Sequence, residues 1–336
     1  MNFDFTDDQH EIKRTARDLL TNRSTWAKVR EAAEAGRYDL DLWRELGELG
    51  WPGIAISEEH GGQGLGVVEL VILLEELGFA CAATPFLGTA LAGLAIQSAG
   101  SPEQQARWLP GLASGELRGA LGAPGLIPDG DGADVFVLVT ADGMRLVDSG
   151  QAGAQAVDAI DPTRRHASVT DDVAQAGDPL PGDIELATDL GRTAVSAELV
   201  GIAQRAMEMG VAYVKDRQQF GTPVGAFQAV AHRCAQMLRD TEMARSATYH
   251  AAWAADADPE RLPEAAGVAK AAASQAGRDV TSSSIQVHGG IGFTWEADVH
   301  WLFKRAQIDA ALLGGAGAQR GRLARMAAAR LAAVRA

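Results

Sequence analysis

The sequence has few features that would place the protein in a membrane or in an oxidising compartment. It contains two cysteines, Cys81 and Cys234, and neither lies in a CxxC pair or in a spacing typical of metal ligands. We expect both to be small buried side chains of a reduced protein. The first residues are acidic and then amphipathic, without the apolar core of a signal peptide, and no apolar run reaches about 18 residues. These absences predict a cytoplasmic protein with no membrane span.

Positive charge is also scarce, since 30 lysines and arginines stand against 44 acidic residues, giving a net charge of −14. Binding to nucleic acid needs a basic face, so this balance excludes nucleic acid as the main partner. A few well-placed arginines could still hold a phosphate group locally. The chain of 336 residues is too long for one small core and predicts two or three packed units.

The hydrophobic pattern divides the chain into three parts. Residues 1–118 have helical patterning, with Thr6 and Ser101 as candidate N-caps of two of the helices. Residues 119–187 are rich in glycine, aspartate and proline; here ADVFVLVTADGMRLVD predicts a hairpin and DPTRRHASVT another strand. Residues 188–336 are helical again. The predicted fold is mainly α, with a small β domain between two helical domains.

Two apolar stripes at helical spacing mark the last domain. The first stripe consists of Leu199, Ile202, Ala206, Met209 and Tyr213. The second lies on one face of the predicted last helix and consists of Leu323, Met326, Ala327, Leu331 and Val334.

The segment DRQQFGTPVGAFQAVAHR, residues 216–233, joins two predicted helices through a Gly-Thr-Pro turn. Arg217 and Phe220 flank the end of the first helix. A guanidinium group at this place could bind a pyrophosphate through two hydrogen bonds, and the phenyl ring could stack on an adenine. On the residues alone, a helix-end arginine and a core phenylalanine are the more common explanation, and His232 is more often an ordinary helix residue than a ligand.

A second segment, QVHGGIGFTWE at residues 286–296, is rich in glycine. Gly289, Gly290 and Gly292 would let the backbone approach a ligand closely. The segment is not a Rossmann fingerprint, because no strand precedes it and the glycine spacing differs. The run HGGQGLG at residues 60–66 is neither that fingerprint nor a Walker loop. Each of these motifs is weak when taken alone.

Taken together and in this order, the segments resemble the acyl-CoA dehydrogenase family, whose members are FAD flavoproteins. EEHGGQGLGVVELVILLEELG resembles the N-terminal helical domain of that family, RQQFGTPVGAFQAVAHRCAQM its arginine–phenylalanine signature, and QVHGGIGFTWEADVHWLFKRAQI its C-terminal glycine signature. The resemblance runs through nearly the whole chain. It implies a helical domain, a small β domain and a C-terminal four-helix bundle, assembled as dimers or tetramers, with an acyl-CoA substrate and an electron-transfer acceptor.

The resemblance also implies which residues contact FAD. In the family these groups reach across a dimer interface to the flavin bound by the neighbouring subunit. They would be Arg217 at the diphosphate, Gln219 and Phe220 at the adenosine, Val224 and Phe227 around the adenine, and Gln286, Gly289 and Gly290 beside the pyrophosphate.

The catalytic glutamate of that family is missing from the expected place. In most members, a glutamate after the glycine signature removes the α-proton of the acyl-CoA while a hydride leaves the β-carbon for the flavin. Because this proton is weakly acidic, the reaction needs a positioned base. Setting IDAALLGGAGAQR against that loop places Leu313 at the base position, and leucine cannot accept a proton. Some members carry the glutamate on the first helix of the bundle, where this chain has Gly191. Nearby Glu198 is interpreted as structural.

The β domain departs from the family pattern as well. GALGAPGLIPDGDGADVFVLV leads almost directly from the start of the flavin-contacting segment to a late strand, so the strands that would hold the chain's own flavin are expected to be missing. The chain therefore resembles the non-catalytic subunit of actinobacterial heterotetrameric (α2β2) acyl-CoA dehydrogenases of steroid side-chain degradation, with a Glu-bearing homologue as partner. Two alternatives stay open. One is a self-sufficient dehydrogenase with Glu198 or Asp309 as an unusual base, and the other is a redox-inert acyl-CoA-binding or scaffold protein.

Overall fold

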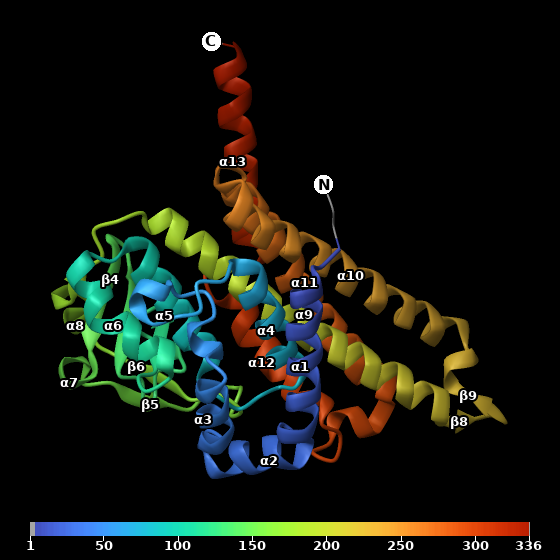
Figure 1. Cartoon of the computed structure of the whole chain (residues 1–336). Helices are drawn as coiled ribbons and strands as arrows, with labels where there is room; N and C mark the ends of the chain where they lie inside the picture. Colours follow the sequence, from blue (N-terminus) through green and yellow to red (C-terminus); the bar gives the residue numbers. More distant parts are fainter. Residues whose placement is uncertain (1–3, 336) are drawn as a thin grey trace.

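The computed structural model describes residues 4–335 and contains a helical N-terminal domain, a small β region and a bundle of long helices (Figure 1). α1 (Asp7–Arg23) follows Thr6, whose hydroxyl accepts a hydrogen bond from the backbone of Gln9. α6 (Pro102–Ser114) follows Ser101 in the same way. In both helices the side-chain oxygen of the glutamine three residues on accepts a hydrogen bond from the backbone N–H of the cap residue. The two hydrogen bonds satisfy donors that the start of a helix leaves free. Both predicted N-caps are confirmed.

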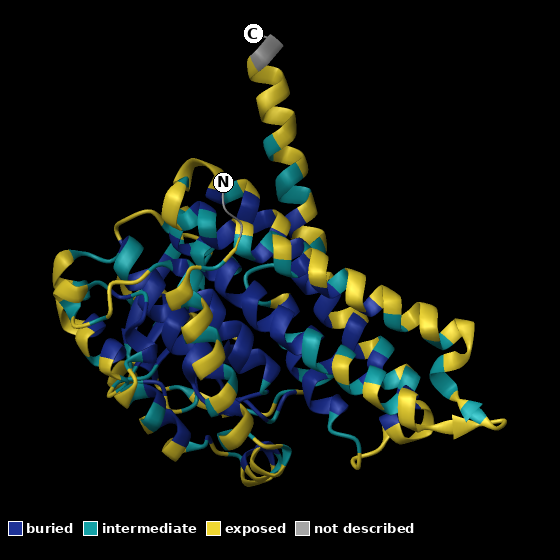
Figure 2. Cartoon of the chain, turned by 45° about the vertical axis from the view of Figure 1, so that its right-hand side comes forward, coloured by how far each residue is buried: buried dark blue, intermediate teal, exposed yellow. Residues whose placement is uncertain are grey.

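Between these helices the N-terminal domain packs around a buried pair, α4 and α5. The elements in this part are α2 (Trp26–Ala35), α3 (Leu40–Glu48), the 3-10 turns η1 (Trp51–Gly53) and η2 (Glu58–His60), α4 (Val67–Phe79) and α5 (Phe86–Ala99). α4 and α5 are apolar on nearly all sides, as expected for helices inside a core. Figure 2 shows the resulting buried interior in dark blue.

The β region consists of short strands in two sheets. β1 (Gly119–Gly122), β3 (Val135–Thr140), β4 (Gly143–Asp148) and β7 (Asp178–Pro179) form one sheet in the order β1-β3-β4-β7, and β2 (Ile127–Pro128), β6 (His166–Ser168) and β5 (Gln155–Val157) form the other in the order β2-β6-β5. Two short helices, α7 (Ser149–Ala152) and α8 (Asp171–Ala176), lie beside them.

Both strand predictions for this region are confirmed. The predicted hairpin is β3–β4, in which Thr140 pairs with Gly143 beside the turn. The predicted further strand is β6.

The C-terminal part is a bundle in which α9, α10 and α11 run side by side (Figure 1). Its elements are α9 (Ile184–Asp216), β8 (Gln218–Gln219), β9 (Thr222–Pro223), η3 (Val224–Ala226), α10 (Gln228–Ala257), η4 (Pro259–Arg261), α11 (Leu262–His288), η5 (Gly289–Phe293), α12 (Val299–Ala311) and α13 (Ala316–Arg335). α9 begins before residue 188, so the predicted domain boundary falls inside this helix. In the first predicted stripe, Leu199, Ile202 and Ala206 are buried, whereas Met209 and Tyr213 are half-buried.

The N-terminal domain meets the bundle where α4 crosses α9. A Cβ atom on Gly201 of α9 would overlap the backbone oxygen of Glu75, and one on Gly78 of α4 would overlap that of Glu198. The two helices can approach this closely only because both positions are glycine. Asp256 at the end of α10 makes a second link, since its carboxylate accepts hydrogen bonds of 2.8 and 3.0 Å from the first two N–H groups of α4.

We expect Gly201→Ala to destabilise the protein by about 2 kcal/mol, because the added methyl group must push two packed backbones apart. Gly317→Ala is the matched control, since this exposed helical glycine has no atom within 4 Å of its would-be Cβ. The control should be neutral or more stable by up to about 1 kcal/mol. Urea unfolding measures both, and equal stabilities of the two variants would contradict the close crossing.

The two cysteines differ in their surroundings. Both are free, and Cys81 is buried as predicted. Cys234 is half-buried, so the prediction of burial is wrong for this residue; it lies on α10, which packs through only part of its surface. Across residues 4–335, no helix has the length and apolar character needed to cross a membrane.

Candidate functional site

The two segments predicted to carry chemistry come together at one end of the bundle. They line a groove of about 700 Å³ between the end of α9, the start of α10 and the end of α11. Predicted contact residues in its lining are Arg217, Gln219, Val224, Gln286, Gly289 and Gly290. The other lining residues are Tyr213, Ala229, Val230, Arg233, Val287, His288 and Ile291. We call this the bundle-end groove.

A tight hairpin, β8–β9, forms one wall of the groove. Phe220 and Gly221 occupy its turn with φ values of 53° and 75°, a combination typical of the turn that best fits two-residue hairpins. The hairpin sends the chain back so that Val224 N–H donates a 2.8 Å hydrogen bond to the Arg217 carbonyl. This leaves the Phe220 ring 93% exposed, with Phe227 edge-on at 6.3 Å. Neither phenylalanine lines the groove, and neither is a core residue.

The opposite wall is the end of α11. His288 is buried, its Nδ1 lies 2.7 Å from the Ser284 carbonyl, and its ring stacks on Tyr213 at 4.7 Å. The backbone then turns at Gly289, which has a φ of 65°. A Cβ atom on Gly289 or on Gly290 would meet no atom of this chain within 4 Å. The glycine backbone is therefore open to a ligand, as its sequence suggested.

Two guanidinium groups give the groove a positive character. Arg217 has no ion pair or side-chain hydrogen bond to any of the residues 4–335. Arg233 makes only a long 3.4 Å hydrogen bond to the Ser283 hydroxyl. Arginines held without a carboxylate partner at a concave surface suit a phosphate or carboxylate ligand, to which the guanidinium can donate two parallel hydrogen bonds.

Leu313 and Gly191, the two positions predicted to correspond to the family's base, face each other. α12 ends at Ala311, and the following turn holds Leu313 at a φ of 56°. Gln319 fixes this turn by donating hydrogen bonds of 3.0 and 3.1 Å to the carbonyls of Leu313 and Gly314. Leu313 Cδ1 lies 2.7 Å from the place that a Cβ atom on Gly191 would occupy, and a Leu91 methyl lies at 3.5 Å. Apolar side chains fill the space beside Gly191, where a carboxylate on α9 would stand.

Beneath this contact lies a group of ionisable residues, of which the sequence analysis singled out only Glu198 and Asp309. We call it the buried charge cluster, and it consists of Asp129, Asp161, Arg164, Glu198, Arg305 and Asp309. Arg164 reaches Glu198 at 2.6 Å and Asp309 at 3.4 Å. The cluster joins the β region to α9 and α12.

Glu198 is fixed inside this cluster. Its Oε1 accepts from Arg164 at 2.6 Å and from Arg305 at 3.5 Å, and its side chain is buried. Arg305 also donates a 2.9 Å hydrogen bond to the carbonyl of Ala82 in the N-terminal domain. A carboxylate shared by two arginines at a junction of domains fits the structural interpretation made from sequence.

Asp309, one turn before Leu313, is fully buried, and Arg164 faces its carboxyl group. Burial raises the pKa of Asp309 to about 8 against the opposing charge of Arg164, and the charge of Glu198 adds to the rise. The neighbouring Lys270 donates to the carbonyls of Asp309 and Ala310, both at 3.1 Å, and burial lowers the pKa of its amine to about 7. Through these hydrogen bonds Lys270 holds the end of α12 in place, and neither its side chain nor that of Asp309 is exposed to solvent.

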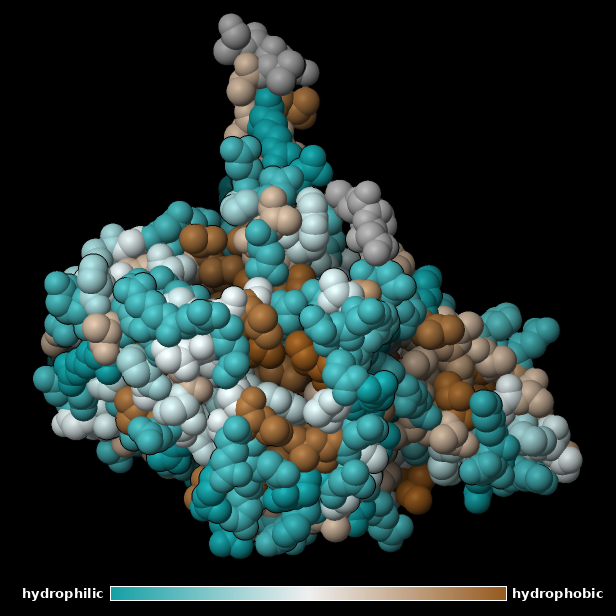
Figure 3. All heavy atoms as spheres, viewed as in Figure 1, coloured by the Kyte–Doolittle hydropathy of each residue, from teal (hydrophilic) through white to brown (hydrophobic). Residues whose placement is uncertain are grey.

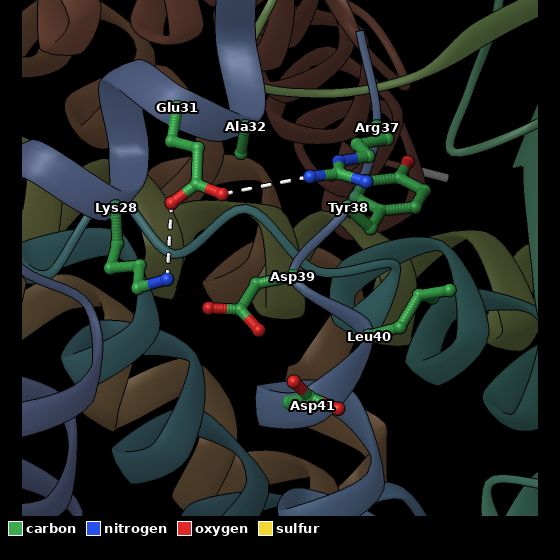
Figure 4. A pocket seen from close by; sticks show the side chains of 8 residues that line it. All are labelled: Lys28, Glu31, Ala32, Arg37, Tyr38, Asp39, Leu40 and Asp41. Atoms are coloured by element: carbon green, nitrogen blue, oxygen red, sulfur yellow. Dashed lines mark hydrogen bonds and ion pairs between the residues drawn. The ribbon is translucent and has the colours of Figure 1, made fainter. Parts of the chain in front are cut away.

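A smaller concavity of about 200 Å³ lies between α2 and α3 (Figure 4). Its lining contains none of the predicted site residues. Glu31 pairs there with Lys28 at 3.0 Å and with Arg37 at 3.6 Å, so the charges of these three side chains largely neutralise one another. We assign no ligand to this concavity.

Comparison with known proteins agrees with this geometry. Family models described as acyl-CoA dehydrogenase, N-terminal domain, and acyl-CoA dehydrogenase, C-terminal domain, match residues 6–116 and 184–328. Acyl-CoA dehydrogenase IpdE2 of Mycobacterium tuberculosis is 38% identical over 310 residues, which cover 91% of this chain and 93% of that relative. The chain belongs to the acyl-CoA dehydrogenase family.

Solved structures of acyl-CoA dehydrogenases confirm the predicted fold. A chain of a Tcur3481-Tcur3483 steroid ACAD variant superposes with a TM-score of 0.84 at 30% identity, covering 97% of this chain and 99% of that one. A chain of the ChsE4-ChsE5 complex from Mycobacterium tuberculosis gives 0.84 at 27% identity, covering 98% and 99%. Members of the family normally bind FAD, and one with this fold, from Bacillus anthracis, has been solved in complex with FAD.

Sequence reasoning therefore found six of the thirteen residues that line the bundle-end groove. Arg233 lies inside the quoted arginine–phenylalanine segment and would have been found by placing it on the same helix face as Val230. Tyr213 was assigned only to an apolar stripe and His288 to no role, because their contact joins helices that are far apart in sequence. No comparison tests the assignment of individual residues to FAD, so these assignments stay predictions.

Proposed function

We propose that this chain is the FAD-completing, non-catalytic subunit of a heterotetrameric acyl-CoA dehydrogenase, with a Glu-bearing homologue as the catalytic partner. The observation that carries the proposal is the contrast between two places in the molecule. The bundle-end groove keeps an unpaired Arg217 and an open glycine backbone. The base positions hold Leu313 and Gly191, and apolar side chains fill the space beside Gly191.

The groove has the features that an FAD diphosphate and adenosine need. Arg217 would donate to the diphosphate, and the backbone around Gly289 and Gly290 would approach it closely. The exposed rings of Phe220 and Phe227 stand beside the groove, where the partner subunit would cover them. When bound, FAD supplies the acceptor for the hydride that leaves the acyl-CoA.

The base for the reaction would come from the partner. The two carboxyls considered as unusual bases, those of Asp309 and Glu198, are buried and face arginines. The acyl-CoA thioester would then bind beside the partner's glutamate. Because the cofactor would contact both chains, its binding free energy would favour the mixed assembly over either chain alone.

The relatives support this assembly and suggest a substrate class. Two of the similar structures come from proteins made of two different chains, and one of these is described as a steroid ACAD. We propose an acyl-CoA thioester substrate, such as the CoA thioester of a steroid side chain, with electrons passing to an electron-transfer acceptor. The protein would act in the cytoplasm.

Co-expression with a Glu-bearing homologue, followed by a flavin count, tests the proposal. The chain alone should bind little FAD and have no dehydrogenase activity, whereas the complex should be yellow and active with one FAD for each pair of chains. A yellow, active assembly of this chain alone would contradict the proposal. A complex that contains no flavin would instead favour the redox-inert scaffold.

Replacing Glu198 separates the proposal from a self-sufficient dehydrogenase. Glu198→Gln should leave turnover of the assembled complex unchanged, since the carboxylate faces arginines and not a ligand. Glutamate-to-glutamine replacement of the partner's base is the positive control and should abolish turnover. Loss of turnover in Glu198→Gln with full flavin content would favour the self-sufficient alternative.

A further inference from the structure

The last helix leaves the body of the molecule before it ends. Every residue from Ala327 to Ala333 is exposed, and Figures 1 and 2 show this part of α13 standing clear of the bundle. We call residues 324–335 the arm. Helices in proteins gain most of their stability from packing one face against a neighbour. Beyond Met326, the only contact of the arm given for the described residues of its own chain is the exposed ion pair between Arg330 and Glu264.

The apolar stripe predicted for this helix is used only at its base. Leu323 packs against α11, where its methyl group lies 3.1 Å from the place of a Cβ on Gly267. Met326 is half-buried, and further along Leu331 is 61% exposed. Figure 3 shows hydrophobic surface beside hydrophilic surface near the end of the arm. The side chain of Val334 lies outside the described residues. The stripe therefore continues past the body as an apolar ridge.

α13 is also strongly basic on an acidic chain. It contains five arginines and no acidic residue, so the remainder of the chain carries −14 − 5 = −19. Arg322, near the start of the helix, is held by Asp189 at 2.7 Å and by Glu185 at 3.2 Å. On the arm itself, Arg330 pairs with Glu264 at 2.6 Å, but both side chains are more than half exposed. Such an exposed pair contributes only about 0–1 kcal/mol, so it can be exchanged at little cost.

A matching acidic surface lies beside the base of the arm, where α10 turns into α11. We call Asp258, Glu260, Glu264 and Val268 the acidic corner. Glu260 is exposed and has no ion pair with any of residues 4–335. Val268, one turn after Glu264, is 44% exposed and supplies an apolar contact next to these carboxylates. The corner thus offers what the arm needs, negative charge beside an apolar side chain.

We propose that the arm docks on the acidic corner of a second copy of this chain, and that the two copies exchange arms reciprocally. Two basic arms would repel each other, whereas arm against corner brings opposite charges together. In a twofold pair each copy presents both surfaces, so a single contact is made twice and the assembly closes.

The arm and the β8–β9 hairpin lie at different ends of the bundle (Figure 1). The bundle-end groove therefore stays free for the Glu-bearing partner. The count of four chains rests on the proposed function, that is, on a heterotetramer with two copies of each chain. In that assembly the arms join the two copies of this chain.

Native mass spectrometry of the co-expressed complex, combined with a flavin count, tests the exchange. The double variant Arg330→Glu/Leu331→Asp should weaken association of the two copies by at least about 100-fold, because each change acts in two symmetric contacts. The complex should fall from four chains to two, one of each kind, with the flavin content per pair unchanged. Arg239→Glu makes the same charge change on α10 away from the arm and should leave four chains.

A charge swap adds a rescue. Arg330→Glu and Glu264→Arg should each loosen the pairing of copies, and the two changes combined in one chain should restore it. An arm variant that still forms a complex of four chains would overturn the proposal. Loss of the Glu-bearing chain from the complex would overturn it as well, because the arm would then bind the Glu-bearing chain and not a second copy of this chain. If the Glu-bearing homologue does not form a complex with this chain, the proposed function fails. The same variants measured on this chain alone still test the arm, because they should then convert a dimer of this chain into monomers.

Discussion

Arg217→Ala should release FAD from the assembled complex, weakening cofactor binding by at least about 100-fold. Hydrogen bonds from a charged donor to a charged acceptor contribute about 1.5–3 kcal/mol each, and an arginine can make two such bonds to a diphosphate. Arg217→Lys keeps the charge but loses the paired geometry, so its effect should be intermediate. Arg239→Ala, on the outer surface of α10, is the control and should bind flavin normally. Flavin absorbance after exhaustive dialysis measures all three.

The same variant should leave the fold unchanged, which separates a lost ligand contact from a damaged protein. Arg217 makes no side-chain hydrogen bond or ion pair within residues 4–335, so its removal breaks nothing inside the chain. The free energy of unfolding of the isolated chain should change by less than about 0.5 kcal/mol. A complex of Arg217→Ala that keeps its full flavin content would show that the groove does not hold the diphosphate.

Local sequence signals were sufficient for several elements of the fold, including one end of the groove. The N-caps at Thr6 and Ser101, the β3–β4 hairpin and the glycine end of α11 depend on residues a few positions apart. The resemblance to a family then joined two segments that lie far apart in the chain. The structure brings them to one groove, because α9 and α11 pack side by side and end near each other.

The contacts that sequence reasoning missed join residues far apart in the chain. Arg164 and Glu198 are separated by 34 positions and Arg305 and Asp161 by 144, so no periodic pattern connects them. Phe220 is exposed and not buried because a tight turn places it at a hairpin tip. A pattern based on hydrophobicity assigns such a ring to the core, whereas only the backbone conformation shows that it points outward.

Leu313, predicted to stand where the family carries its base, and the buried charge cluster belong to the same part of the molecule. Leu313 follows α12 directly, and Asp309 and Arg305 lie on α12 itself. The cluster contains four carboxyls and two guanidinium groups, all buried. Negative charge in excess is costly in a buried environment, and a carboxyl group there relieves the cost by keeping its proton. Asp309, whose pKa burial raises to about 8, is the group that does so.

Asp309→Asn should therefore change how stability depends on pH. In the unfolded chain an aspartate loses its proton near pH 4, whereas in the folded chain Asp309 keeps it up to about pH 8. Between these values the native state binds one more proton than the unfolded state, so Asp309 costs stability as the pH rises, by about 1.4 kcal/mol per pH unit. The uncharged asparagine removes this cost. Relative to wild type, the variant should gain several kcal/mol between pH 4 and pH 8.

Urea unfolding of the isolated chain at pH 5, 6 and 7 measures the effect. This window avoids the titration of Lys270, because burial lowers the pKa of its amine to about 7. Above that pH the contribution of Lys270 to the unfolding free energy rises with pH, which is opposite in sign to the contribution of Asp309. Asp142→Asn, at the exposed turn of the β3–β4 hairpin, removes a carboxylate of the same type without a buried environment and should follow wild type at every pH. If the difference in unfolding free energy between wild type and Asp309→Asn stays constant over this window, Asp309 is ionised in the folded protein. The buried charge cluster would then carry its full negative charge beside Leu313.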